Sequence, residues 1–109
     1  MWLWLSAFLL GQLVETPIYF VALGRPAAPR RRRWLRLTIA FGATALTHPF
    51  AWFAVGRLAP ALGFWLTVAL VEAAVVLVEA AYLRLWRVPR ALPWALAANA
   101  ASFGVGLLL

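Results

Sequence analysis

The chain has 109 residues, of which 66% are hydrophobic and only 12% are charged, and its mean hydropathy is +0.90. Soluble domains are about 45–50% apolar and about 25% charged, and a chain this short cannot bury so much apolar surface in water. These values exclude an ordinary soluble globule and predict that lipid surrounds most of the protein.

Four apolar stretches follow one another along the chain, and each is long enough to cross a bilayer as a helix, which takes about 20 residues. In chain order they are Trp2–Leu23, Trp34–Val55, Ala61–Leu83 and Ala91–Leu109. The predicted connections between them are short, so consecutive helices should be antiparallel neighbours. They are Gly24–Arg33, Gly56–Pro60 and Arg84–Arg90. The sequence therefore predicts an all-α, four-helix transmembrane bundle that forms one domain over residues 1–109.

The arginines predict an orientation for this bundle. The first and third connections are rich in arginine, whereas the second holds only Arg57. The positive-inside rule places arginine-rich connections in the cytoplasm, so both termini are expected outside. All basic residues are arginine, and the chain is rich in alanine, which is typical of GC-rich bacterial genomes. The expected location is a bacterial inner membrane.

The basic residues beside the spans are interpreted as anchors on anionic lipid headgroups, because they lie at the ends of apolar stretches. The predicted headgroup residues are Arg30, Arg31, Arg32, Arg33, Arg84, Arg87 and Arg90. Aromatic residues do not alternate with them as they would along a nucleic-acid groove, so nucleic acid is not an expected partner. The absence of cysteine excludes disulfides, thiolate metal sites and cysteine nucleophiles.

All three acidic residues, Glu15, Glu72 and Glu79, fall inside predicted spans, and so does the only histidine, His48. A charge near the bilayer centre costs at least about 2.5–3.5 kcal/mol, so polar groups there usually mark a function. Glu72 lies too deep for its carboxylate to reach water easily, and it must find a partner in the protein or stay protonated. Glu79 is closer to the cytoplasmic arginines and is expected to extend toward them.

Counting about 1.5 Å of rise per residue from the nearest arginine gives each polar group a depth. Glu15, Thr44 and Asn99 come out roughly 12–15 Å deep, and His48, Glu72 and Ser102 roughly 18 Å deep, whereas Glu79 lies at roughly 8 Å. We therefore predict a buried polar cluster that binds a ligand or ion. Its expected members are Glu15, His48, Glu72 and Asn99, with Thr44 and Ser102 beside them, and Glu79 is a further candidate for binding the ligand or ion.

Two prolines lie next to ionisable residues. Pro17 follows Glu15 by two residues, and Pro49 directly follows His48. A proline inside a helix removes a backbone hydrogen bond and kinks the helix, and kinked helices with polar side chains often line cavities in transporters. Pro17 and Pro49 are predicted helix kinks near the polar cluster.

Three functions remain open from the sequence. The first is an accessory subunit or binding module, in a homo-oligomer or a larger membrane complex, whose polar cluster serves a partner, ion or small ligand. The second is translocation of protons or cations through an oligomer by Glu15, His48 and Glu72. The third is an intramembrane enzyme with a metal or quinone, which is the least favoured because no metal-binding motif such as His-Glu-x-x-His is present. The sequence identifies no cofactor and no catalytic residue.

Overall fold

A computed structural model describes residues 2–108 of the chain, which form four helices and no strand. The helices are α1 (Trp2–Leu23), α2 (Arg33–Leu62), α3 (Phe64–Leu85) and α4 (Ala91–Leu108). All four are long and apolar enough to cross a membrane. The structure thus confirms the predicted all-α class and the number of helices, and each helix has the length and apolar composition that a membrane span needs.

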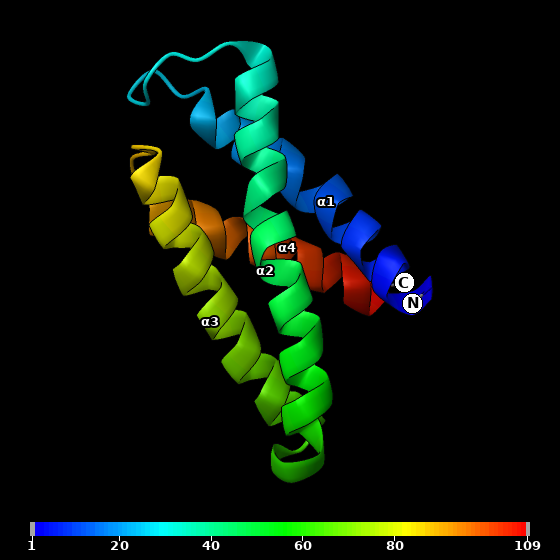
Figure 1. Ribbon diagram of the computed structural model, residues 1–109. Coiled ribbons are helices and arrows are strands. Elements are labelled where there is room, and N and C mark those ends of the chain that lie inside the picture. Colours follow the sequence, from blue (N-terminus) through cyan, green and yellow to red (C-terminus); the bar gives the residue numbers. More distant parts are fainter. Residues whose placement is uncertain (1, 109) are drawn as a thin grey trace.

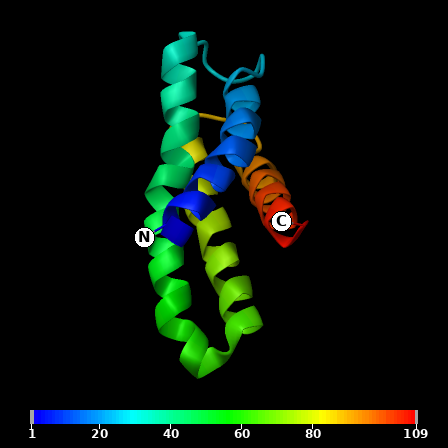
Figure 2. The ribbon, with the colours of Figure 1, turned by 90° about the vertical axis from the view of Figure 1, so that its right-hand side faces the viewer.

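The helices pack in a ring in which α1 contacts α2, α2 contacts α3, α3 contacts α4 and α4 returns to α1. The bundle is closed at the end that carries the two longer connections and forks at the other end. There α1 and α4 lean away from the α2–α3 hairpin, which extends beyond both termini (Figures 1 and 2). The molecule measures 45 × 24 × 22 Å.

The predicted second connection, Gly56–Pro60, is wrong, because these residues continue α2 as helix. The helix runs for 30 residues and ends at Gly63, which forms the whole turn before α3. Gly63 has φ +86°, a conformation that glycine adopts without the steric cost that a Cβ would impose. At about 1.5 Å per residue α2 is about 45 Å long, so it reaches past the roughly 30 Å hydrocarbon core of a bilayer.

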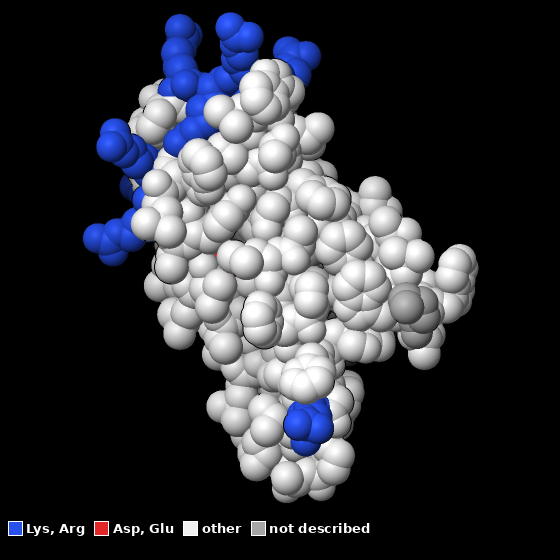
Figure 3. Space-filling model, in the orientation of Figure 1, with Lys and Arg blue, Asp and Glu red and all other residues white. Residues whose placement is uncertain are grey.

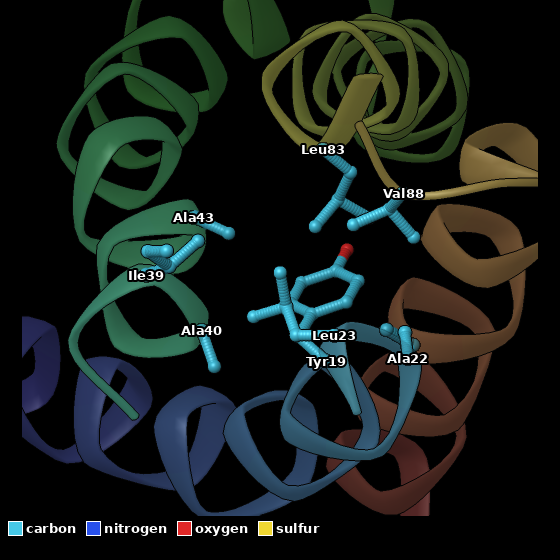
Figure 4. Close-up of a cluster of buried hydrophobic side chains, with 9 residues drawn as sticks. Tyr19, Ala22, Leu23, Ile39, Ala40, Ala43, Leu83 and Val88 are labelled. Carbon is cyan, nitrogen blue, oxygen red and sulfur yellow. The ribbon is translucent and has the colours of Figure 1, made fainter. Parts of the chain in front are cut away.

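A packed apolar layer closes the bundle near the end with the longer connections (Figure 4). Its members come from all four helices and from the α3–α4 connection: Tyr19, Ala22, Leu23, Ile39, Ala40, Ala43, Leu83, Val88 and Ala98. Alanine supplies much of the layer on α1, α2 and α4, which lets these helices approach closely. Tyr19 is fully buried within it, and its hydroxyl points across the bundle toward α3 (Figure 4).

The two longer connections are tied to each other and to the helices. Arg31 donates a hydrogen bond to the carbonyl of Trp86, and its guanidinium lies 5.7 Å from the centre of the Trp86 ring. Arg36 donates to the carbonyl of Phe20 at 2.8 Å and lies over the Phe20 ring at 4.0 Å. Because Phe20 lies in the last turn of α1, Arg36 caps the carbonyl end of that helix, where a cation is favoured.

The surface fits a protein surrounded by lipid. Large hydrophobic side chains such as Leu13, Phe50 and Leu77 are more than 60% exposed along the sides of the helices. Basic side chains gather at the end with the two longer connections, and almost no acidic surface is visible on the same face (Figure 3). This separation of apolar sides and a basic end is typical of an integral membrane protein.

Candidate functional site

A partly open cavity of about 630 Å³ lies in the fork of the bundle and is lined by all four helices. It extends from the apolar layer toward the α2–α3 turn, reaching Phe64 and Trp65 on α3 and Leu107 on α4. Its wall includes all three carboxyl groups of the chain, the single histidine and four other polar side chains. These residues are Glu15, Glu72, Glu79, His48, Thr44, Thr47, Asn99 and Ser102. The structure therefore brings every predicted site residue to one cavity.

Glu79 lies at the closed end of the cavity and is 1% exposed. Its carboxyl group accepts hydrogen bonds from three other helices. Tyr19 of α1 and Asn99 of α4 donate to Oε1, the latter at 2.9 Å, and Thr47 of α2 donates to Oε2 at 2.5 Å. One side chain of α3 is thereby joined to α1, α2 and α4, so we interpret Glu79 as the residue that holds the four helices together.

The expectation that Glu79 extends toward the arginine-rich end is wrong. The side chain points into the bundle, where three uncharged donors satisfy its oxygens, and the apolar layer separates it from the arginines. The shallow depth of Glu79 along α3, taken alone, suggested that its carboxyl group could reach water. The neighbouring helices remove that access, because their side chains cover this turn of α3 on the inner face.

Glu15 is the second buried carboxyl group, with 5% exposure. It accepts one hydrogen bond, from Thr44 at 2.8 Å, which joins α1 to α2. One turn earlier on α1, Gln12 donates to the carbonyl of Phe41 at 3.1 Å and accepts from Thr16 at 2.6 Å. Glu15 thus has fewer partners than Glu79 and keeps acceptor capacity toward the cavity.

Glu72 lies on the same face of α3 as Glu79, about 10 Å nearer the open end, because the two are seven residues apart. It is half-buried and lines the cavity. Glu72 and Asn99 also line a second, largely apolar groove of about 630 Å³ between α3 and α4. The seam between these helices is therefore loosely packed at the level of Glu72, which gives this carboxyl group a route toward lipid as well as toward the cavity.

His48 lies on the cavity wall among three aromatic rings, those of Trp4, Phe8 and Trp52, with centroid distances of 5.4–6.3 Å. Its Nε2 atom is buried and has no hydrogen-bond partner among the described residues. His48 was predicted to lie near a carboxyl group, and in the structure it lines the same cavity as Glu15 and Glu72. A buried ring nitrogen without a partner is unusual, and it marks this wall as a place where a ligand can supply one.

The two remaining predicted members lie on α4. Asn99 is 5% exposed, and its amide donates to Glu79, to the hydroxyl of Tyr19 at 3.3 Å and to the carbonyl of Ala95 at 2.9 Å. Ser102 is half-buried on the cavity wall. Asn99 therefore belongs to the contact that holds the helices together, whereas Ser102 lines the cavity near Glu15.

Both prolines that were predicted to kink helices lie inside helices, Pro17 in α1 and Pro49 in α2. Pro60, expected in a connection, is also within α2. Near Pro49, the hydroxyl of Thr47 donates to the carbonyl of Ala43 at 3.3 Å in addition to Glu79. Side-chain hydroxyls near a helix proline thus serve both the backbone and the cavity wall.

No group of three or more His, Asp or Glu side chains is placed to hold a metal ion within residues 2–108. The carboxyl groups share a cavity without converging on one point, since Glu72 and Glu79 are about 10 Å apart along α3. This arrangement does not fit the metal centre that was left open from the sequence.

Tyr19 and Thr47 are functional residues that the sequence reasoning missed. Tyr19 lies six residues before Arg25, at roughly 9 Å, and Glu79 lies five residues before Arg84, at roughly 8 Å. Their equal depth was a usable signal for a contact between α1 and α3. It was overlooked because tyrosine is common at membrane interfaces, where it needs no partner in the protein.

No protein family matches the chain, and no curated protein or solved structure is significantly similar to it. The function therefore has to be argued from the cavity and its chemistry.

Proposed function

We propose that this protein is an integral membrane binding module whose cavity takes a small cationic ligand with an apolar body, such as a protonated amine. The observation that carries the proposal is the composition of the cavity wall: it holds all three carboxyl side chains of the chain and none of its ten arginines. An ionised carboxylate out of water is costly unless it is paired. A cation in the cavity offsets that cost.

The size and the walls of the cavity support an organic cation over an inorganic one. Its volume of about 630 Å³ is within the range of small-molecule sites, which are mostly apolar with a few placed polar groups. Trp52, Trp65 and Phe103 contribute aromatic rings to the wall. Such rings attract cations through their negative faces. The acceptor groups available to a ligand are the carboxyl groups of Glu15 and Glu72, since Glu79 is occupied by its three donors.

The loosely packed seam between α3 and α4 supports access from the membrane. Glu72 lines both the cavity and the groove on the outer side of this seam. An amphipathic amine dissolved in the bilayer would keep its apolar body in lipid until its charge meets Glu72. In this account Glu72 makes the first contact and Glu15 lies deeper.

We propose binding in place of translocation because the apolar layer separates the cavity from the arginine-rich end. A path for protons or cations through a single chain would have to open this layer, where Tyr19, Leu23 and Leu83 are at most 1% exposed. The orientation with the termini outside and the arginine-rich connections in the cytoplasm remains part of the proposal, and so does a bacterial inner membrane. In that orientation the cavity faces the outer leaflet.

The test uses three ligands with one apolar cage and different charge. 1-Aminoadamantane is a cation at neutral pH, 1-adamantanol is neutral and 1-adamantanecarboxylate is an anion. We expect the purified protein in detergent to bind the amine at least about tenfold more tightly than the alcohol, because a close charge pair contributes about 1.5 kcal/mol or more. Equal affinity for the amine and the alcohol, or a preference for the carboxylate, would refute the cationic ligand, and no binding of any of the three would refute the binding module.

A further inference from the structure

A third pocket lies at the opposite end of the molecule, between the two arginine-rich connections. It has a volume of about 420 Å³. It is lined by Arg25 of the α1–α2 connection, by Arg90 of the α3–α4 connection and by Trp94 in the first turn of α4. This pocket is separate from the cavity, which is on the other side of the apolar layer, and its ionisable side chains are arginines instead of glutamates.

No carboxyl group of the chain can neutralise these two arginines. The three acidic residues all lie on the cavity wall, and the connections contain none. α4 begins at Ala91, directly beside the pocket, so the positive end of its dipole adds to the charge of the guanidinium groups. The pocket therefore favours an anion from outside the chain.

The backbone of the α3–α4 connection gives independent support. Arg87 and Arg90 have φ values of 61° and 56°, in the left-handed region that residues with a Cβ rarely adopt. Glycine or asparagine would hold these positions at a lower conformational cost. The chain has arginine at both, and residues held in such conformations cluster at binding sites. The strain is therefore an argument that the side chain at position 90 is used.

The two connections form a fixed site. Arg31 joins them through its hydrogen bond to the carbonyl of Trp86. Ala28 and Val88 are 7% and 4% exposed and anchor the connections in the bundle. Arg25 accepts a backbone hydrogen bond from Ala28 at 3.0 Å, which closes a turn behind it. The pocket walls are thus held in place without a ligand.

We infer that this pocket binds the phosphate group of an anionic phospholipid. The shared chemistry is a phosphate between two guanidinium groups, which suits the planar donors of arginine. A lipid is favoured over a soluble phosphate because the pocket lies at the ends of membrane-spanning helices and Trp94 forms part of its wall. Tryptophan is enriched at this level of a bilayer, and basic pockets between helices hold lipid headgroups.

The test measures binding of short-chain dioctanoyl phosphatidylglycerol to the full chain in neutral detergent, with dioctanoyl phosphatidylcholine and inorganic phosphate as comparisons. Arg90→Gly removes the guanidinium group and relieves the left-handed backbone. Arg32→Gly is the matched control, because Arg32 is an exposed residue of the other connection, lies outside the pocket and has an ordinary φ of −62°. Both variants lose one positive charge.

We expect Arg90→Gly to bind phosphatidylglycerol at least about fivefold more weakly than the wild type, the factor carried by roughly 1 kcal/mol per arginine at a headgroup. Its melting temperature should equal or exceed that of the wild type. Arg32→Gly, which removes a predicted headgroup arginine outside the pocket, should weaken binding by a smaller factor than Arg90→Gly does. Equal weakening in both variants would mean diffuse attraction to negative charge and would overturn the site. If inorganic phosphate bound as tightly as phosphatidylglycerol, a lipid would be overturned as the ligand of the pocket. A melting temperature of Arg90→Gly below that of the wild type would overturn the inference that position 90 serves binding.

Discussion

Replacing Glu79 by alanine tests the role of this residue in holding the four helices together. The substitution removes the acceptor of three hydrogen bonds between helices, those from Tyr19, Thr47 and Asn99. Such bonds contribute about 0.6 kcal/mol on average in membrane proteins, and up to about 1.7 kcal/mol. The expected loss in the free energy of unfolding is therefore about 2 kcal/mol, with an upper bound of about 5 kcal/mol.

The three donors lose their acceptor to different degrees. Asn99 keeps the carbonyl of Ala95, and Thr47 keeps the carbonyl of Ala43. The hydroxyl of Tyr19 still accepts from Asn99 at 3.3 Å, but its O–H is left without an acceptor. Tyr19→Phe in the Glu79→Ala background should consequently recover part of the lost stability, because it removes the donor that is left without a good partner.

Glu72→Ala is the matched control for this experiment. Glu72 lies on the same helix and the same face, the change in helix propensity is identical, and the carboxyl group is half-buried on the cavity wall. We expect its free energy of unfolding to change by less than about 0.5 kcal/mol, as for sites outside specific contacts. The assay is reversible unfolding with a denaturing detergent, followed by circular dichroism. A loss for Glu72→Ala as large as that for Glu79→Ala would refute the distinction between the two carboxyl groups.

Two further substitutions test the packing. A Cβ at Gly42 would lie 2.6 Å from the hydroxyl oxygen of Tyr82, which donates to the carbonyl of Ile39 at 2.8 Å. Gly42→Ala should therefore lower the free energy of unfolding by about 1–3 kcal/mol in the same detergent unfolding assay. The control is Gly56→Ala in the same helix, where an added Cβ meets nothing within 4 Å and should be neutral or stabilising. Arg36→Gln should destabilise by about 1 kcal/mol through loss of the cap on the last turn of α1, and an unchanged melting temperature would contradict that role.

The sequence was sufficient for the number of helices and for the bounds of α1 and α4, whereas the predicted third span, Ala61–Leu83, began inside what is α2. The long second helix could not be derived, because Gly56 and Pro60 are both residues that commonly end helices. In the structure α2 nevertheless continues through both residues and keeps its helical backbone up to Leu62. The turn is instead made by Gly63, a single glycine between apolar residues, which carries no other turn signal.

The candidate site was predictable as a group of residues and a common depth, because polar side chains stand out against an apolar chain. The sequence did not predict which of these residues hold the helices together and which face the cavity. Glu79 and Glu72 occupy one face of one helix, yet only the positions of Tyr19 and Asn99 on other helices make Glu79 a structural contact and leave Glu72 free. Spacing along one helix does not contain that information, since it depends on how the neighbouring helices are rotated.

The most direct test of the central claim measures binding and stability on the same Glu72→Gln sample. Glutamine keeps the shape of the side chain and removes its charge. The account predicts that affinity for 1-aminoadamantane falls at least about tenfold while the melting temperature stays at the wild-type value, because Glu72 serves the ligand and not the fold. Wild-type affinity in Glu72→Gln would contradict the account, and so would a lower melting temperature that accompanies the loss of binding.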